Sequence, residues 1–414
     1  MNSRVAADLT LGHALQARVP SHSVPGCARV AFLTGSTGFL GAHLLEELLA
    51  RGDLDEIVCL VRASNDTQAR ARLLDTLTTR APDCLGQVQR VHAVAGDISK
   101  PCFGLKDATF VWIADKAETI FHCAAQINLV YPYRLLRTTN VLGTYEVLTL
   151  AMLGTPKTLH YVSSLAVPNT SQSESAHSIL ETLRVPYNRS ITPGYVESKW
   201  VAEQLVNSAG QGGLPVCIYR PGLITGHSRT GICNPRDVLS LMLRACLQLR
   251  VAPDSSERVH LTPADYVAQA IGELSRQAES VGKAFHLINP KCLSWHQIAE
   301  AMSAYGYIDR ALPYREWLLC LRNHAITHTD PDLKVLAALV SGWPHSEHND
   351  HPRFDDANTR KGLANAPYVR CPDDNIALLI RYLQWLKPDP AGAYFEPTPG
   401  QLTSGNDDYV SGDS

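Results

Sequence analysis

Three glycines spaced three residues apart, Gly35, Gly38 and Gly41, interrupt the stretch VAFLTGSTGFLGAHLLEELL at residues 30–49. The run before them is apolar and rich in strand formers, and apolar residues return at helical spacing from Phe39 onward. A glycine turn between a buried strand and a helix lets the backbone approach a pyrophosphate, and the helix N-terminus adds free N–H groups. The stretch predicts the first βα unit of a dinucleotide-binding domain. The simpler alternative is a turn that needs glycine for its geometry alone.

Strand and helix signals alternate along the first half of the chain. Strands are expected at 29–34, 56–61, 88–95, 119–124, 158–162 and 215–219, and helices at 39–51, 67–80, 140–152 and 195–207. Continuous apolar strands joined by helical crossovers predict an α/β fold, a Rossmann-type doubly wound parallel sheet with helices on both faces. Beyond residue 225, helices at 294–305, 314–324 and 374–386 and a strand at 284–288 predict a smaller, mostly helical lobe.

The same pattern suggests a domain organisation. Residues 1–28 are expected to form an N-terminal extension, and residues 29–224 the nucleotide-binding domain, with segments near 260–291 returning to it. Residues 225–259 and 292–395 are expected to form the C-terminal substrate lobe. The polar residues 396–414 are expected to be a disordered tail.

Composition excludes several classes of function. The 414 residues carry a formal charge of −3, which gives no reason to expect nucleic acid or an anionic membrane as a partner. No apolar run approaches the ~20 residues of a membrane helix, and Asp8 interrupts any secretory signal. Eleven scattered cysteines without a C-x-x-C pair indicate reduced thiols and a cytoplasmic protein. No metal site is expected, because His345, His348 and His351 lie in a Pro- and Asn-flanked loop that is typical of a solvated surface.

The end of the second strand indicates which dinucleotide is bound. An NAD site has an acid there, whereas this strand ends at Arg62, and Arg72 follows on the next helix. Two arginines suit a 2′-phosphate, so the sequence favours NADPH, although Arg62 could instead be a solvated loop charge. Asp97 follows the third strand and could bond the adenine amine. Ala124 and Ala125 follow the fourth strand and would leave room for the cofactor.

The candidate catalytic residues come later in the chain. Tyr195 and Lys199 are four residues apart, so a helix would place them on one face. A nearby ammonium is expected to lower the pKa of the phenol and to help it exchange protons. Ser164, at the end of the fifth strand, is expected to polarise the substrate oxygen, with Ser163 nearer the cofactor; the two serines could have the reverse roles. The alternative for Tyr195 is an ordinary position on an amphipathic helix.

Several of these motifs together resemble a known family. TGSTGFLG, GDIS, HCAA, NVLGT, YVSS, the Tyr195–Lys199 spacing and YRPG are similar to the extended short-chain dehydrogenase/reductases. Over about residues 8–390 the chain more narrowly resembles the thioester reductase domains that end nonribosomal peptide and polyketide synthetases, and the reductase domain of carboxylic acid reductases. This likeness rests on CLVRA, YRPGLITGHSRTGICNPRD, VHLTPADYVAQAI and PYREW as well as the glycine stretch. The family often has threonine where this chain has Ser164, and serine supplies the same donor.

The resemblance implies a reaction, a partner and a fuller set of site residues. NADPH would reduce an acyl or peptidyl thioester on the phosphopantetheine arm of a carrier protein to an aldehyde, and some relatives continue to an alcohol. No covalent intermediate is needed, so Cys123 is expected to serve only strand packing. The implied catalytic residues are Ser164, Tyr195 and Lys199. The implied cofactor-binding residues are Thr34, Gly35, Ser36, Thr37, Gly38, Phe39, Leu40, Gly41, Arg62, Arg72, Asp97, Ile98, Ala124, Ala125, Asn140, Ser163, Tyr195, Lys199, Arg220, Pro221 and Gly222.

Other interpretations stay open at this point. A fatty acyl-CoA reductase uses closely related chemistry. Arg62 argues against a nucleotide-sugar epimerase or dehydratase, and the three candidate catalytic residues argue against a non-catalytic NADP sensor. Residues 227–237 could be a mobile gate over the cofactor or an ordinary connection. Four arginines could form a basic surface for an acidic carrier or could be scattered solvated charges; they are Arg134, Arg137, Arg244 and Arg250.

Overall fold

The computed structural model describes residues 3–16, 28–155, 157–168, 178–187, 191, 193–328, 330–341 and 353–387. The expected surface loop with His345, His348 and His351 and the expected tail at residues 396–414 lie outside these residues. None of the helices described is both long enough and apolar enough to cross a bilayer.

A seven-stranded sheet forms the centre of the molecule, in the order β12-β7-β5-β4-β1-β2-β3. Every neighbouring pair of its strands is parallel. The order reverses at β1, so the carboxyl ends of β1 and its neighbours open a crevice where an α/β sheet binds its ligand. The doubly wound Rossmann-type sheet is therefore confirmed. Its strands are β1 (Val30–Thr34), β2 (Glu56–Val61), β3 (Val91–Ala95), β4 (Thr119–His122), β5 (Thr158–Val162), β7 (Val216–Pro221) and β12 (Ala284–Leu287).

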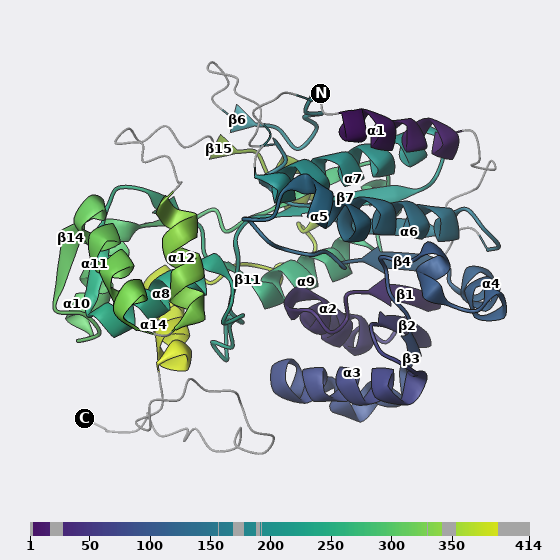
Figure 1. Cartoon of the computed structure of the whole chain (residues 1–414). Helices are drawn as coiled ribbons and strands as arrows, with labels where there is room; N and C mark the ends of the chain where they lie inside the picture. The colour runs from purple at the N-terminus through teal and green to yellow at the C-terminus, as the bar shows by residue number, and fades with distance from the viewer. Residues whose placement is uncertain are drawn as a thin grey trace, which may run out of the picture.

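Helices cover both faces of this sheet, as Figure 1 shows. Their apolar sides build one buried cluster on each face, which is why the strands carry nearly continuous apolar runs. On one face lie α1 (Ser3–Gln16), α4 (Asp107–Lys116), α5 (Tyr133–Arg137), α6 (Gly143–Ala151) and α7 (Gly194–Gln211). On the other lie α2 (Phe39–Ala50), α3 (Asp66–Arg80) and α9 (Ala264–Leu274).

A second, mostly helical lobe lies at the left of Figure 1 and has its own buried cluster. This lobe agrees with the smaller helical part expected from the sequence. Its helices are α8 (Val238–Leu249), α10 (Trp295–Ala304), α11 (Tyr314–Thr327), α12 (Pro331–Ser341) and α14 (Asn375–Leu386). Short strand pairs accompany it: β9 (Val251–Asp254) with β14 (Arg310–Pro313), and β10 (Arg258–Val259) with β13 (Leu293–Ser294).

The remaining short elements connect these parts. β8 (Ile224–Thr225) pairs with β11 (Thr262–Pro263), and β6 (Ser178–Ile179) pairs with β15 (Arg353–Phe354). The single-turn and irregular helices are η1 (Pro82–Arg90), η2 (Pro101–Gly104), η3 (Thr138–Leu142), η5 (Ala278–Ser280) and α13 (Ala357–Gly362).

Two of the expected elements need correction. The strand expected from residue 88 begins only at Val91, because Pro82 starts a 3₁₀ helix that continues to Arg90. The helix expected at 140–152 begins earlier, with the π-helical turn η3, and becomes α-helical at Gly143. Such π turns are rare and often lie at functional sites.

The N-terminal helix α1 is an integral part of the nucleotide-binding domain. It packs against α7, and the Cβ of an alanine at Gly12 would lie 2.8 Å from the Ser208 Oγ atom. Asp8 is buried and accepts a hydrogen bond of 2.6 Å from the Tyr133 hydroxyl. Its carboxylate also forms an ion pair with Arg137. The expected N-terminal extension is therefore joined to α5 and α7 by both packing and charge.

Candidate active site

The glycine turn closes the carboxyl end of β1 onto the start of α2. Gly35 has a φ of +82°, and a Cβ there would lie 2.7 Å from the Ala124 backbone nitrogen. A Cβ at Gly41 would lie 2.0 Å from the Gly35 carbonyl oxygen. Only glycine fits either position, so the first turn of α2 sits directly on the loop. A cradle of this shape suits a dinucleotide pyrophosphate, and the cofactor-binding roles of residues 34–41, which form the turn, stay predictions.

The charged residues predicted at the adenosine end lie together beyond β2 and β3. The Arg72 Nη1 atom donates a 2.8 Å hydrogen bond to the Arg62 carbonyl oxygen, and both arginines are exposed. Partial burial acts to raise the pKa of Asp97, but hydrogen bonds from Ser99 and the charge of Arg62 outweigh it and lower that pKa. The structure therefore places two cations and one carboxylate at the sheet edge where a cofactor ribose and adenine would lie.

Asn140 fixes the loop that follows β4. Its Oδ1 atom accepts from the Gln126 backbone N–H at 2.7 Å, and its Nδ2 atom donates to the Gln126 carbonyl at 3.1 Å. Nδ2 also lies 2.9 Å from the Ser198 Oγ atom on α7. Ala124 and Ala125 are thus held between the glycine turn and the helix that carries Tyr195. Ile98 is also predicted to bind the cofactor, and it packs closely against Gly143. A Cβ atom at Gly143 would lie 2.9 Å from the Cγ1 atom of Ile98.

The three predicted catalytic residues are brought together by β5 and α7. Ser164 follows β5, and its side chain lies near the phenol of Tyr195, in the first turn of α7, where it acts to lower the pKa of that phenol. The Lys199 Nζ atom donates to the Val162 carbonyl at 2.6 Å and lies 4.5 Å from the centre of the Tyr161 ring. The arrangement supports the assignment of these residues, which stays a prediction.

The expected lowering of the Tyr195 pKa is not found in this structure. Burial raises the pKa of Tyr195 to about 12, and Ser164 acts in the opposite direction. The charge of Lys199 acts on the pKa values of His122 and Cys123 but contributes no shift to the phenol. The phenol is therefore protonated at neutral pH and can act as a hydrogen-bond donor to a developing oxyanion.

Ser163 has a different partner from Ser164. Its hydroxyl donates a 2.5 Å hydrogen bond to the Glu203 Oε2 atom, and the Glu203 Oε1 atom pairs with the Arg220 Nη2 atom at 2.6 Å. Arg220 also donates to the Glu181 and Leu183 carbonyls at 3.1 and 3.2 Å. The geometry favours Ser164 over Ser163 as the hydroxyl beside Tyr195.

Two residues predicted to bind the cofactor therefore have side chains engaged by the protein itself. The hydroxyl of Ser163 and the guanidinium of Arg220 belong to this buried network, while Pro221 and Gly222 end β7 and continue into the carboxyl edge of the sheet. The cofactor-binding roles of all four stay predictions. Sequence reasoning missed Glu203, although its position four residues after Lys199 is a signal for the same helix face.

Cys123 is poorly suited to act as a nucleophile. Burial raises the pKa of its thiol to about 12, and the opposing effect of the Lys199 charge is smaller. Because the thiolate is the reactive form, this cysteine is almost entirely unreactive at neutral pH. The structure thus agrees with a reaction that forms no covalent enzyme intermediate.

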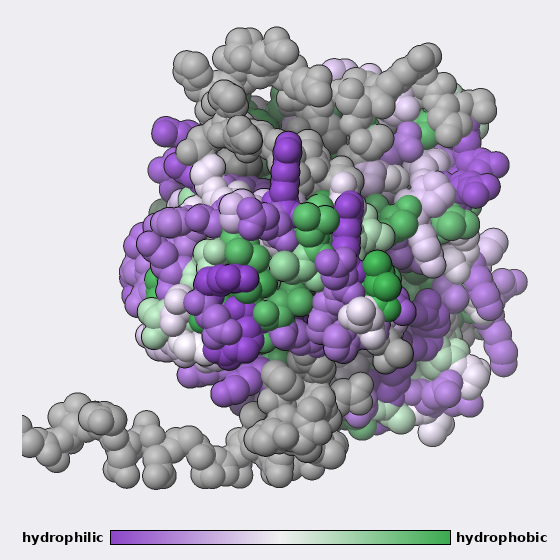
Figure 2. Space-filling model, turned by 60° about the vertical axis from the view of Figure 1, so that its left-hand side comes forward, coloured by the Kyte–Doolittle hydropathy of each residue, from purple (hydrophilic) through white to green (hydrophobic). Residues whose placement is uncertain are grey.

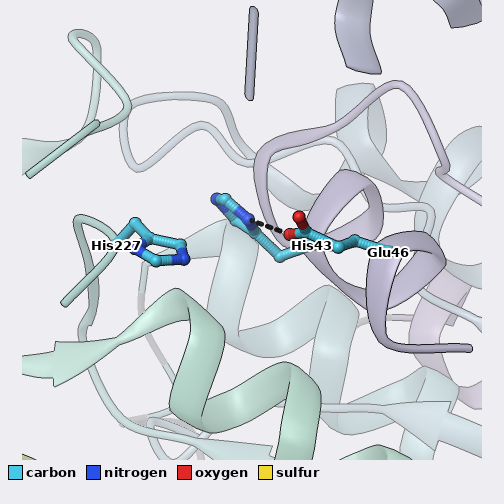
Figure 3. Close-up of side chains that lie close together, drawn as sticks. All are labelled: His43, Glu46 and His227. Atoms are coloured by element: carbon cyan, nitrogen blue, oxygen red, sulfur yellow. Dashed lines mark ion pairs between the residues drawn. The ribbon is translucent and has the colours of Figure 1, made fainter. Parts of the chain in front are cut away.

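A histidine cluster behind the glycine turn is the one group among the described residues whose spacing invites a metal assignment. His43, Glu46 and His227 offer ligand atoms within 4.8 Å of one another (Figure 3). The His227 Nδ1 atom, however, accepts backbone N–H groups from Arg229 and Thr230 at 3.1 and 3.3 Å. In the neutral ring its Nε2 atom therefore carries the proton and cannot bind a metal. We assign no metal to this cluster.

Residues 227–237 are tied to both lobes. The backbone N–H and the hydroxyl of Ser228 donate to the two Asp265 carboxylate oxygens at 2.8 and 2.5 Å. Arg381, on α14, donates to the Ser228 carbonyl at 2.9 Å. These bonds favour an ordinary connection between the lobes over a mobile gate.

Three of the four arginines considered for a basic surface are paired with carboxylates. Arg137 pairs with Asp8, Arg250 with Asp309, and Arg244 with Asp330 and Asp332. Of the four, only Arg134 is exposed without an ion pair among the described residues. On the face of the molecule drawn in Figure 2, hydrophobic residues gather near the middle and hydrophilic residues surround them. The geometry therefore favours scattered charge over a basic docking surface.

A parallel sheet whose carboxyl edge carries a glycine turn and a serine–tyrosine–lysine cluster defines an NAD(P)-dependent reductase of the short-chain dehydrogenase/reductase type. The family described as male sterility protein matches residues 33–271, more than half of the 414 residues. The chain belongs to this family.

Three individual proteins show which members of this family the chain resembles. The terminal R domain from the myxalamid PKS-NRPS biosynthetic pathway is 37% identical with a TM-score of 0.83, and the match covers 92% of this chain and 96% of that domain. A linear gramicidin synthase of Brevibacillus parabrevis is 36% identical over 318 residues, or 77% of this chain. The non-canonical nonribosomal peptide synthetase hkm10 of Aspergillus hancockii is 33% identical over 371 residues, or 86% of this chain. The chain spans only 6% and 36% of these two synthetases.

Membership of this reductase family confirms the resemblance seen in the sequence. It decides against a nucleotide-sugar epimerase and against a non-catalytic sensor. The family relationship supports NAD(P) as the cofactor, and the glycine cradle that a Cβ would fill fits such a group.

Proposed function

We propose that the chain catalyses the NADPH-dependent reductive release of an acyl or peptidyl thioester from the phosphopantetheine arm of a carrier protein, giving an aldehyde. The observation that carries this proposal is that Ser164, which follows β5, and a protonated Tyr195, in the first turn of α7, lie near one another at the carboxyl edge of the sheet that also carries the glycine turn. Two hydroxyl donors at that place suit a carbonyl that becomes an oxyanion. The 37% identity to a terminal R domain supports a thioester as the source of that carbonyl.

The choice of NADPH rests on the two arginines beyond β2. Arg62 and Arg72 stand where an NAD-binding domain of this type places an acid for the ribose hydroxyls. Their guanidinium groups would pair with a 2′-phosphate by charge-assisted hydrogen bonds. Asp97 can accept a hydrogen bond from the adenine amine with the oxygen that Ser99 does not occupy.

When bound at the glycine turn, the cofactor would supply a hydride to the thioester carbonyl carbon. The residues of the chain perform the remaining steps. Ser164 and Tyr195 donate hydrogen bonds to the carbonyl oxygen as it gains negative charge. When the carbonyl re-forms, the carbon–sulfur bond breaks, and the pantetheine sulfur leaves as a thiolate that takes a proton from solvent. The product is an aldehyde after one two-electron reduction.

The carrier is proposed as the partner because the relatives that share at least a third of their residues with this chain include large synthetases. The helical lobe lies beside the sheet (Figure 1), and we propose that this lobe contacts the carrier and its arm. Coenzyme A carries the same arm and is the nearest alternative donor of the acyl group.

The direct test is the identification of the product. A carrier loaded with one acyl group is incubated with NADPH carrying deuterium at the transferable position, the proteins are removed by filtration, and the aldehyde in the filtrate is then trapped as an oxime. We expect one deuterium in each trapped aldehyde and one NADPH consumed for each aldehyde formed. Release of free carboxylic acid without NADPH consumption would contradict the proposal.

A further inference from the structure

Glu203 lies on the same face of α7 as the two predicted catalytic residues of that helix. Tyr195, Lys199 and Glu203 follow one another at intervals of four residues, which places them in a row along the helix. The Glu203 side chain is only 2% exposed. A carboxylate in such a place is costly unless it is paired, and the mechanism proposed for the chain gives it no role.

The partners of Glu203 join three elements of the site. Its carboxylate accepts from Ser163, which follows β5, and from Arg220, which lies on β7. The backbone N–H of Ser163 also donates to the Tyr219 carbonyl at 2.7 Å. The segment that carries Ser164 is thereby fixed through its neighbouring residue, both by side chain and by backbone.

Glu203 lies one helical turn beyond Lys199 on the same face of α7, and its charge acts on that lysine. Burial lowers the pKa of Lys199 to about 8, and the charge of Glu203 acts most strongly in the opposite direction. The Arg220 guanidinium that pairs with Glu203 is the other charged group of this network. His122, Cys123 and Tyr195 carry no charge at neutral pH, because burial lowers the pKa of His122 to about 3 and raises those of Cys123 and Tyr195 to about 12. The Tyr161 ring beneath the Lys199 ammonium is neutral as well. Without Glu203, the lysine would lose its proton at a lower pH.

We propose that Glu203 is a positioning residue that keeps Lys199 protonated and holds Ser163, so that Ser164 stays against Tyr195. A protonated Lys199 is the stronger hydrogen-bond donor to the cofactor ribose. The turnover part of this inference rests on the proposed function, whereas its cofactor-binding part does not.

The test measures NADPH affinity between pH 6 and pH 9.5 by cofactor fluorescence, with no thioester present. For the unmodified chain, affinity should fall as the pH rises through the Lys199 pKa, because the uncharged amine is a poorer partner for the ribose. In Glu203→Gln, the midpoint of this fall should move to lower pH by about one unit, since removal of a nearby opposite charge typically shifts a pKa by that much. Between the two midpoints, the variant should bind up to about tenfold more weakly.

Glu197→Gln is the matched control on the same helix. Glu197 is half-buried and bonds the Tyr187 hydroxyl at 3.2 Å, so the substitution is chemically identical but lies off the face of Lys199. Its pH midpoint should equal that of the unmodified chain. An identical midpoint in Glu203→Gln would overturn the electrostatic part of the proposal. This outcome does not depend on whether thioesters are reduced, so it is separable from a failure of the proposed function.

Ser163→Ala tests the positioning part of the proposal, in which Glu203 holds Ser163. This variant decides the proposal if Glu203→Gln does not fold. It removes the hydrogen bond to Glu203 without changing a charge. We expect kcat to fall about tenfold with an unchanged pH midpoint, and Ser163→Thr to restore most of the loss. An unchanged kcat in Ser163→Ala would overturn the positioning role.

Discussion

The hydroxyl of Ser163 donates a 2.5 Å hydrogen bond to the buried carboxylate of Glu203, although the two residues lie on different elements. The next residue, Ser164, lies instead near the phenol of Tyr195 and acts to lower its pKa. The two adjacent serines thus have separate partners, one the candidate catalytic phenol and one a buried ion-pair network. This division is the basis of the first two predictions.

Removal of the Tyr195 hydroxyl should abolish most turnover. Tyr195→Phe deletes a positioned donor and should lower kcat by about 10²–10⁴-fold while NADPH affinity stays within a few-fold. Stopped-flow measurement of NADPH oxidation, together with a fluorescence titration, separates the two effects. Tyr368→Phe is the control, because Tyr368 is exposed and its hydroxyl donates a hydrogen bond to Glu273 on the surface. Near-normal turnover in Tyr195→Phe would remove Tyr195 from the mechanism.

The two serines should differ in the size of their effects. Ser164→Ala removes a donor to the developing oxyanion and should cost about 10²–10³-fold in kcat. Ser163→Ala acts only through the position of its neighbour and should cost about tenfold. The comparison of the two kcat values under saturating substrate decides the assignment. A larger loss in Ser163→Ala would reverse the two roles.

The cofactor preference should depend on the arginines beyond β2. Each charge-assisted hydrogen bond is worth roughly 1.5–3 kcal/mol, so loss of even one contact predicts about tenfold weaker discrimination or more. Arg62→Ala combined with Arg72→Ala should therefore bring the kcat/KM values for NADPH and NADH closer together. Arg134→Ala, an exposed arginine elsewhere on the surface, should leave their ratio unchanged. A double variant with the ratio of the unmodified chain would place the 2′-phosphate elsewhere.

The glycine turn should not tolerate a methyl group. In Gly41→Ala the new Cβ would lie 2.0 Å from the Gly35 carbonyl oxygen, so the turn must shift. We expect a loss of about 1–3 kcal/mol in the free energy of unfolding and markedly weaker NADPH binding. Gly86→Ala is the control, because a Cβ there meets nothing within 4 Å. Denaturant titration and cofactor fluorescence measure the two quantities, and equal behaviour of the two variants would contradict the cradle.

Local signals allowed most of the central fold to be predicted. The strands β2 and β5 and the start of α2 lie where the sequence places them, because continuous apolar runs and a glycine turn determine them locally. Helix α1 was not foreseen, since its packing depends on a buried contact between Asp8 and residues of α5 that are distant in the chain. Tertiary contacts of this kind leave no periodic signal.

The candidate active site could also be predicted only in part, because its electrostatics depend on tertiary contacts. The four-residue spacing of Tyr195 and Lys199 predicted their shared face, but the expected effect of the lysine on the phenol was wrong. Burial decides the pKa values of both groups, and the burial of a side chain cannot be read from spacing. The partners of Ser163 and Arg220 depend on how α7 docks on the sheet. Motifs therefore located the residues, while their electrostatics needed the structure.

The central claim is that the substrate is a thioester presented by a carrier protein. One acyl group is presented in three ways, as the carrier-bound thioester, as the coenzyme A thioester and as a short N-acetylcysteamine thioester, and NADPH consumption is measured for each. Contacts along the arm and with the carrier can be used to position the reacting carbonyl, so truncation should lower turnover as well as affinity. We predict that kcat/KM falls in that order. Equal values for the carrier and coenzyme A would contradict the claim and favour an acyl-CoA reductase.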